Sequence, residues 1–163
     1  MQNKETRILG IDPGLATLGF GYIACQKREQ MSVPRFLDAG IIETSSDISL
    51  GERLSLIYDD LHQLLQEHKP ELVSIEKLFF YRMSTTIPVA QARGIVLLVL
   101  SQLKIPMLEY TPNQVKLSLT GFGKADKKEV QEAVARELNL DRIITPDDAS
   151  DALALALTAW LNL

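Results

Sequence analysis

Four carboxylates in this chain occupy positions from which they could act together. Asp12 and Glu76 each end a short apolar run typical of a strand, whereas Asp148 and Asp151 lie three residues apart near the start of an expected helix. Strand ends are where α/β sheets bind ligands. Carboxylates gathered near a core repel one another and need cations, and Mg²⁺ prefers oxygen ligands. Two such ions about 4 Å apart can activate water for phosphodiester hydrolysis.

Two of these acids also have an ordinary structural explanation, whereas the other two do not. Asp-Pro-Gly is a common turn, so Asp12 alone could be structural. Asp148 could simply favour the helix dipole. Asp151 directly precedes an apolar run and Glu76 ends another, places where an unpaired acid is costly. Spacing alone does not show that the four meet, so the prediction depends on the whole set.

Short apolar runs bounded by turn residues predict five strands. The expected strands are 7–11, 18–24, 36–43, 72–75 and 105–110. The first three follow one another directly, which predicts an antiparallel meander with a turn in the polar stretch from Gln26 to Arg35.

Five helices are expected between and after these strands. Apolar periodicity, capping residues and helix-stopping glycine or proline locate them. The expected helices are 50–68, 89–103, 112–120, 126–140 and a last helix opened by Thr145-Pro146. The segment from Lys77 to Pro88 lacks clear periodicity and is expected to be a mobile loop. The helix over 89–103 is apolar on most of its circumference, so we expect part of it to pack against another chain.

The composition restricts the class of protein. With 163 residues and 46% hydrophobic content the chain can bury one substantial core, so we expect a single domain over residues 1–163. The lone Cys25 and the absence of a signal-like start indicate a reducing cytoplasm. The longest purely apolar stretch, Ile95 to Leu100, is far shorter than the roughly 20 residues of a membrane span, so no membrane partner is expected.

Charge is unevenly distributed along the chain. A net charge of −4 argues against a nucleic-acid partner, because phosphate binding needs lysine and arginine. Residues 77–94, however, hold three basic and no acidic side chains, and residues 113–128 hold four lysines against one aspartate. Cations bound at the four carboxylates would further reduce the repulsion of DNA. Two basic segments on an acidic body are therefore compatible with DNA binding.

An ordered series of short motifs resembles one nuclease family. In chain order the motifs are Ile11-Asp12-Pro13-Gly14 with Gly19 and Gly21, Ile75-Glu76, Gln91-Ala92-Arg93-Gly94, Gln114-Val115-Lys116, Gly121-Phe122-Gly123 with Ala125 and Lys127, and the run from Asp148 to Ala154. Each motif is weak alone, but the ordered set over about Arg7 to Trp160 is specific. The chain resembles the RuvC family of Holliday-junction resolvases, or crossover junction endodeoxyribonucleases. This implies an α/β, ribonuclease-H-like fold, a five-stranded mixed sheet with helices on both faces.

The resemblance also implies roles for residues at the matching positions. The implied catalytic and metal-binding carboxylates are Asp12, Glu76, Asp148 and Asp151. They would hold two Mg²⁺ ions per subunit, for which Mn²⁺ can substitute, without a protein nucleophile. Lys116 and Lys127 match lysines that support catalysis near the scissile phosphate, and Phe79 matches an aromatic residue that stacks on bases near the crossover. The further DNA-contacting residues expected are Phe80, Tyr81, Arg82, Lys124 and Lys128.

The implied activity is symmetric cleavage of two strands of like polarity in a four-way DNA junction, during recombination and DNA repair. It would leave 5′-phosphate and 3′-hydroxyl ends. Two cuts imply a homodimer, and the family implies partnership with the RuvA and RuvB branch-migration complex. The chain departs from the family pattern at Lys77-Leu78 and at Glu129, which affects expected DNA contacts more than metal binding.

Two other functions are compatible with parts of this pattern. A YqgF-like nuclease of the same fold would act on RNA, but the aspartate pair in the last helix, the two lysines and the aromatic loop favour the resolvase. A catalytically idle junction-binding protein would gain nothing from four carboxylates, which without metals only repel DNA. An actin-like phosphotransferase would need a second domain, which this chain length excludes.

Overall fold

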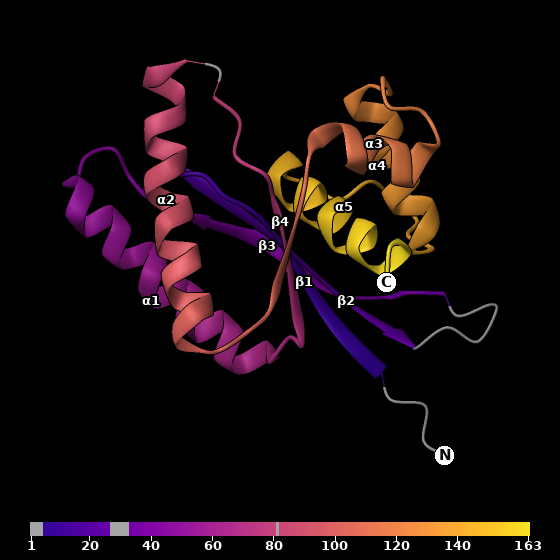
Figure 1. Cartoon of the computed structure of the whole chain (residues 1–163), viewed down its shortest axis with the longest axis horizontal. Coiled ribbons are helices and arrows are strands. Elements are labelled where there is room, and N and C mark those ends of the chain that lie inside the picture. The colour runs from indigo at the N-terminus through magenta and orange to yellow at the C-terminus, as the bar shows by residue number, and fades with distance from the viewer. Residues whose placement is uncertain (1–4, 27–32, 81) are drawn as a thin grey trace.

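The computed structural model describes residues 5–26, 33–80 and 82–163 and contains a five-stranded mixed sheet (Figure 1). The strands are β1 (Glu5–Asp12), β2 (Thr17–Gln26), β3 (Arg35–Glu43), β4 (Leu72–Glu76) and β5 (Met107–Tyr110). Their order across the sheet is β3-β2-β1-β4-β5. β1, β2 and β3 form the predicted antiparallel meander, and β4 pairs in parallel with β1 and β5.

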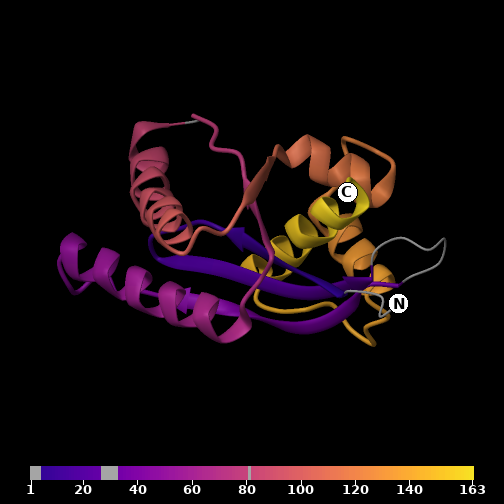
Figure 2. The same cartoon turned by 60° about the horizontal axis from the view of Figure 1, so that its bottom comes forward.

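Helices cover both faces of this sheet, as expected (Figures 1 and 2). The helices are α1 (Leu50–His68), α2 (Met83–Gln102), α3 (Pro112–Thr120), α4 (Lys127–Glu137) and α5 (Asp147–Leu161). One core lies between the sheet and α1 with α2, and a second lies between the sheet and α3, α4 and α5. The order of elements is the one that the sequence predicts.

Local capping signals explain where several helices begin and end. The side chains of Thr111 and Asp126 accept hydrogen bonds from the backbone amides three residues later. The side chains at those later positions in turn accept from the backbone amides of Thr111 and Asp126, so α3 and α4 both begin at capping boxes. Gly121 ends α3 in the left-handed region, with φ of 75°. These boundaries confirm the predicted ones, except that α4 ends at Glu137 rather than near Leu140.

The beginning of α2 differs from the prediction. Residues 83–88 are helical, so the expectation of a loop from Lys77 to Pro88 is wrong for its second half. Pro88 lacks an amide donor and suggested a break. The first turn is nevertheless closed by a 2.8 Å hydrogen bond from the Thr86 amide to the Arg82 carbonyl, and Thr86 is buried. Residues 83–85 and 87 are exposed, so α2 accommodates Pro88 near its N-terminus at the cost of one interior hydrogen bond.

Some predictions concern residues that the structure does not describe. The turn expected between Gln26 and Arg35 falls largely on residues 27–32, and Tyr81, expected to assist DNA binding, is also outside the described residues. The first four residues are outside them as well. These expectations remain predictions.

α2 is also long and apolar enough to cross a membrane, judged by length and composition alone. Its inner side chains instead belong to the core beneath it, where Ala92, Val96 and Val99 are fully buried against the sheet and α1. α2 therefore packs one side into this core and leaves much of its apolar surface exposed.

α5 approaches the sheet at backbone distance because glycines face it. A Cβ atom added to Gly10 would lie 1.7 Å from the Ala152 carbonyl oxygen, and one added to Gly21 would lie 2.5 Å from the Leu153 amide nitrogen. α5 itself is buried on nearly all sides between Ala149 and Ala159. Only glycine permits this contact, so β1 and β2 determine how closely α5 packs and where its residues lie.

We expect Gly10→Ala to lower the free energy of unfolding by about 3 kcal/mol or more, because the methyl group must displace α5 from β1. Gly51→Ala is the matched control, since no atom lies within 4 Å of an added Cβ on this α1 residue. Gly51 stands in the first turn of α1, so the control should change the free energy of unfolding by less than about 1 kcal/mol. Urea denaturation measures both changes, and equal stability of the two variants would contradict the described packing.

Candidate active site

Three elements bring the predicted carboxylates to one end of the sheet. Asp12 ends β1 and Glu76 ends β4, and these neighbouring strands run parallel, so both acids reach the same edge. α5 crosses this edge in the vicinity of Gly19, the strand partner of Asp12, and an added Cβ there would meet the Asp148 backbone. Close packing of α5 therefore places its first turns beside Asp12.

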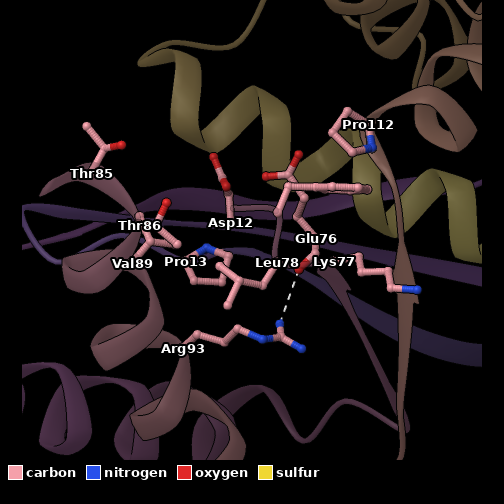
Figure 3. A pocket seen from close by; sticks show the side chains of 11 residues that line it. Asp12, Pro13, Glu76, Lys77, Leu78, Thr85, Thr86, Val89, Arg93 and Pro112 are labelled. Carbon is pink, nitrogen blue, oxygen red and sulfur yellow. Dashed lines mark hydrogen bonds between the residues drawn. The ribbon is translucent and has the colours of Figure 1, made fainter. Parts of the chain in front are cut away.

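The structure brings three of the four predicted carboxylates into direct proximity. One carboxylate oxygen each from Asp12, Asp148 and Asp151 lies within 4.8 Å of the others. Glu76 is not in this group of three among the described residues, but it lies beside Asp12. Figure 3 shows the two side chains directed the same way. The predicted set of four therefore meets as a close trio with Glu76 at its edge.

Two hollows meet at Asp12 and Glu76. One, of about 270 Å³, extends toward α2 and the segment that follows β4 (Figure 3). The other, of about 230 Å³, extends toward α3, α4 and α5. Pro112, at the start of α3, lines both of them. The acidic residues are thus reached from two sides, an arrangement suited to an extended ligand.

Burial and mutual repulsion make these acids hold protons strongly in the metal-free protein. Loss of hydration raises the pKa of Asp12 to about 8, and the charges of Glu76, Asp151 and Asp148 add to this rise. Burial, followed by the charge of Asp151, also raises the pKa of Glu76. The pKa of Asp151 is raised by burial against the opposing effect of Lys127. A bound cation would relieve this repulsion.

Lys127 partly neutralises the cluster from α4. Its Nζ atom lies 3.0 Å from an Asp147 carboxylate oxygen and 3.3 Å from one of Asp151. Burial lowers the pKa of Lys127, but its bonds to Asp147 and Asp151 outweigh this and raise it. Asp147 also accepts a 3.0 Å hydrogen bond from the Gln131 Nε2 atom. Lys127 was predicted as a site residue, whereas its partner Asp147 was not.

The donor atoms fit a hard divalent cation. The converging side chains are carboxylates, and magnesium, manganese and calcium all prefer oxygen ligands. The trio is partly exposed, which leaves room for water in a coordination sphere. The cluster can therefore hold metal ions, and its oxygen-only chemistry fits the expected Mg²⁺ or Mn²⁺.

The predicted DNA-contacting residues lie around this centre at different depths. Lys116 lines the second hollow together with Lys127, and Phe79 lines the first. Phe80 is 70% exposed beside it. The remaining candidates are exposed residues that do not line these two hollows, namely Arg82 at the start of α2, Lys124, and Lys128, which pairs with Glu132 at 3.8 Å.

Arg93 on α2 is a site residue to which the sequence assigned no role. Its Nη1 atom donates a 3.1 Å hydrogen bond to the Glu76 carbonyl oxygen (Figure 3). Its Nη2 atom pairs with the Glu109 carboxylate. In the sequence, Arg93 belongs to one of the family motifs, Gln91-Ala92-Arg93-Gly94, and to the basic segment 77–94. Neither feature indicated that its partners would be Glu76 and Glu109.

Comparison with known proteins identifies a family that matches nearly the whole chain. The family model described as crossover junction endodeoxyribonuclease RuvC matches residues 8–159. A crossover junction endodeoxyribonuclease RuvC of Synechococcus sp. (strain CC9605) is 57% identical over 156 residues, which cover 96% of this chain and 99% of that protein.

Solved structures agree with this result. Thermus thermophilus RuvC superimposes with a TM-score of 0.88 at 34% identity, covering 96% of this chain and 94% of that one. T. thermophilus RuvC in complex with Holliday junction substrate gives a TM-score of 0.89 at the same identity and coverage. The expected ribonuclease-H-like fold is confirmed.

We expect the free energy of unfolding of the metal-free protein to fall as pH rises from about 4 to about 8. The folded protein keeps a proton on Asp12, whose pKa is about 8, whereas the unfolded chain releases it near the ordinary value of 3.8. The stabilisation is complete below the lower value and lost above the higher one. Asp12→Asn cannot ionise and should flatten this dependence.

Urea denaturation in EDTA at stepped pH measures the effect. Asp60→Asn is the control, because Asp60 is exposed on α1 and outside the acidic cluster. An Asp12→Asn variant that retains the wild-type pH dependence would show that Asp12 does not carry the raised pKa.

Proposed function

Because the chain belongs to the RuvC family of crossover junction endodeoxyribonucleases, we propose that it cuts Holliday junctions at the cluster of Asp12, Glu76, Asp148 and Asp151. The protein is a Holliday-junction resolvase, an endonuclease of DNA recombination. The observation that carries the site assignment is the convergence of carboxylate oxygens from β1 and two positions of α5 within 4.8 Å.

The carboxylates act as metal ligands in this proposal. Two Mg²⁺ ions, for which Mn²⁺ can substitute, would supply an activated water and stabilise the leaving oxygen of the phosphodiester. Asp12 and Glu76 stand at the ends of neighbouring strands, and Asp148 and Asp151 on a helix packed on glycine, so the fold fixes the backbone positions of all four ligands. The products would carry 5′-phosphate and 3′-hydroxyl ends.

Lysines and aromatic residues hold the DNA around this centre. Lys116 and Lys127 line the same hollow as Asp151, and in this proposal their ammonium groups would bind phosphate oxygens of the DNA. Phe79 and the more exposed Phe80 offer ring faces on which unpaired bases at a crossover can stack. Additional phosphate contacts are proposed for the exposed basic residues Arg82, Lys124 and Lys128.

The apolar outer face of α2 supports a homodimer. Met83, Ile87, Gly94 and Leu98 follow one another at helical spacing and are all exposed. No atom lies within 4 Å of a Cβ added to Gly94, so a second backbone could approach there. Two subunits would supply the two active sites that paired cleavage needs. Partnership with RuvA and RuvB and a cytoplasmic location follow from the resemblance alone.

We expect Asp151→Asn to abolish cleavage of a labelled four-way junction in Mg²⁺ and to leave junction binding in Ca²⁺ unchanged. The substitution removes one metal-binding charge without adding bulk. Asp60→Asn, on the exposed face of α1, should cleave like the wild type. Linear duplex and an RNA hairpin serve as alternative substrates.

Paired nicks on the junction alone support the resolvase. Undiminished cleavage by Asp151→Asn would refute the proposed metal site. Preferential cleavage of the RNA hairpin would favour the YqgF-like function, and tight junction binding without cleavage by the wild type would favour an idle binding protein.

We expect Leu98→Glu to convert the protein to a monomer that makes unpaired nicks, because a charge would be buried at the α2 contact. Leu56→Glu on α1 is the matched control, since Leu56 is 42% exposed and Leu98 is 47% exposed. Sedimentation velocity at micromolar concentration measures the state of association. A wild-type protein that sediments as a monomer with and without junction would overturn the dimer.

A further inference from the structure

Arg93 is the basic residue of the described chain most closely tied to the backbone of a proposed metal ligand. It lies on α2, and its side chain is only 11% exposed. Its guanidinium reaches two different strands, because it donates to the Glu76 carbonyl at the end of β4 and pairs with Glu109 on β5. A planar fork of donors can hold two acceptors in fixed positions, which a lysine ammonium cannot do as well.

The peptide group that follows Glu76 is hydrogen-bonded at both ends. Its carbonyl oxygen accepts from Arg93 at 3.1 Å, and its amide, that of Lys77, donates to the Tyr110 carbonyl at 2.8 Å. The register of β1 with β4 ends one residue earlier, at the pair of Ile11 with Ile75. Arg93 therefore bonds the strand end just beyond its last pairing with β1.

Fixing this peptide group fixes the direction in which the Glu76 side chain leaves the backbone. β5 holds the amide end through Tyr110, and Glu109, the register partner of Ile75, orients the guanidinium. In Figure 3 the Glu76 carboxylate points away from Arg93 while the carbonyl faces it. Arg93 thus acts on the backbone of Glu76 and leaves the carboxylate available for the metal centre.

We propose that Arg93 is a positioning residue that sets the orientation of Glu76 for metal binding and connects it to α2. This inference rests on the proposed metal site and extends it to a residue that does not itself bind metal. The outer partners of metal ligands commonly change metal affinity by about 10–100-fold when they are replaced. Arg93 is expected to behave in this way through the backbone of its ligand.

The test measures Mn²⁺ binding to the metal-free protein without DNA, by electron paramagnetic resonance. Arg93→Lys keeps the charge but loses the fork, so the dissociation constant should rise about tenfold or more. Arg53→Lys is the matched control, because Arg53 on α1 donates a comparable 2.9 Å bond, but to the Thr44 hydroxyl and not to a proposed metal ligand. Its Mn²⁺ affinity should stay within about twofold of the wild type.

Two further measurements separate positioning from other roles. Junction binding in Ca²⁺ should be the same for Arg93→Lys and the wild type, and a loss of binding would show instead that Arg93 contacts DNA. In a Glu76→Gln background, Arg93→Lys should weaken Mn²⁺ binding no further, because both changes act through one ligand. Fully additive losses would overturn the proposal.

Stability and the metal site itself are controlled separately. If Arg93→Lys does not fold, Glu109→Gln weakens the anchoring of Arg93 and should give a smaller loss of Mn²⁺ affinity, whereas unchanged affinity overturns the proposal. Asp12→Asn tests the underlying site: if it binds Mn²⁺ like the wild type, the proposed metal centre fails. If Asp12→Asn loses affinity and a folded Arg93→Lys does not, only the role of Arg93 fails.

Discussion

The closeness of α5 to the sheet is the constraint on which the rest of the structure depends. β1 and β2 present glycine where the helix crosses them, so the backbone of α5 meets the backbone of the strands at these crossings. Asp148 and Asp151 on α5 can then reach Asp12 on β1. A helix that rested on larger side chains would hold these two aspartates further from Asp12. The acidic centre is thus a product of core packing as much as of its own residues.

Local signals predicted most of the fold, because strands, caps and turns are encoded by neighbouring residues. The end of β1 at Asp12 and the capping boxes of α3 and α4 follow from a few adjacent side chains. The first turns of α2 were missed because residues 83–87 carry no apolar periodicity and Pro88 suggested a break, yet the helix includes Pro88 and buries only Thr86 of its first turn. Sequence periodicity did not indicate this start.

The site was predictable in its carboxylates and less so in their supports. Acids at strand ends and three apart on a helix are visible in a sequence, but the partners of Lys127 and Arg93 are not. Lys127 pairs with Asp147, which follows it by 20 positions in the sequence, and Arg93 bonds Glu76, which precedes it by 17 positions. Both pairings exist only because helices pack against the sheet edge.

The contact of Lys127 with Asp151 has a consequence for metal uptake. In the metal-free protein this ammonium group occupies one proposed ligand, and raised pKa values keep protons on others, chiefly Asp12. An ion that enters the proposed site must therefore displace an internal cation and release protons to the buffer. Apparent metal affinity should then rise with pH until these acids are ionised, and the heat of binding should vary with the ionisation enthalpy of the buffer.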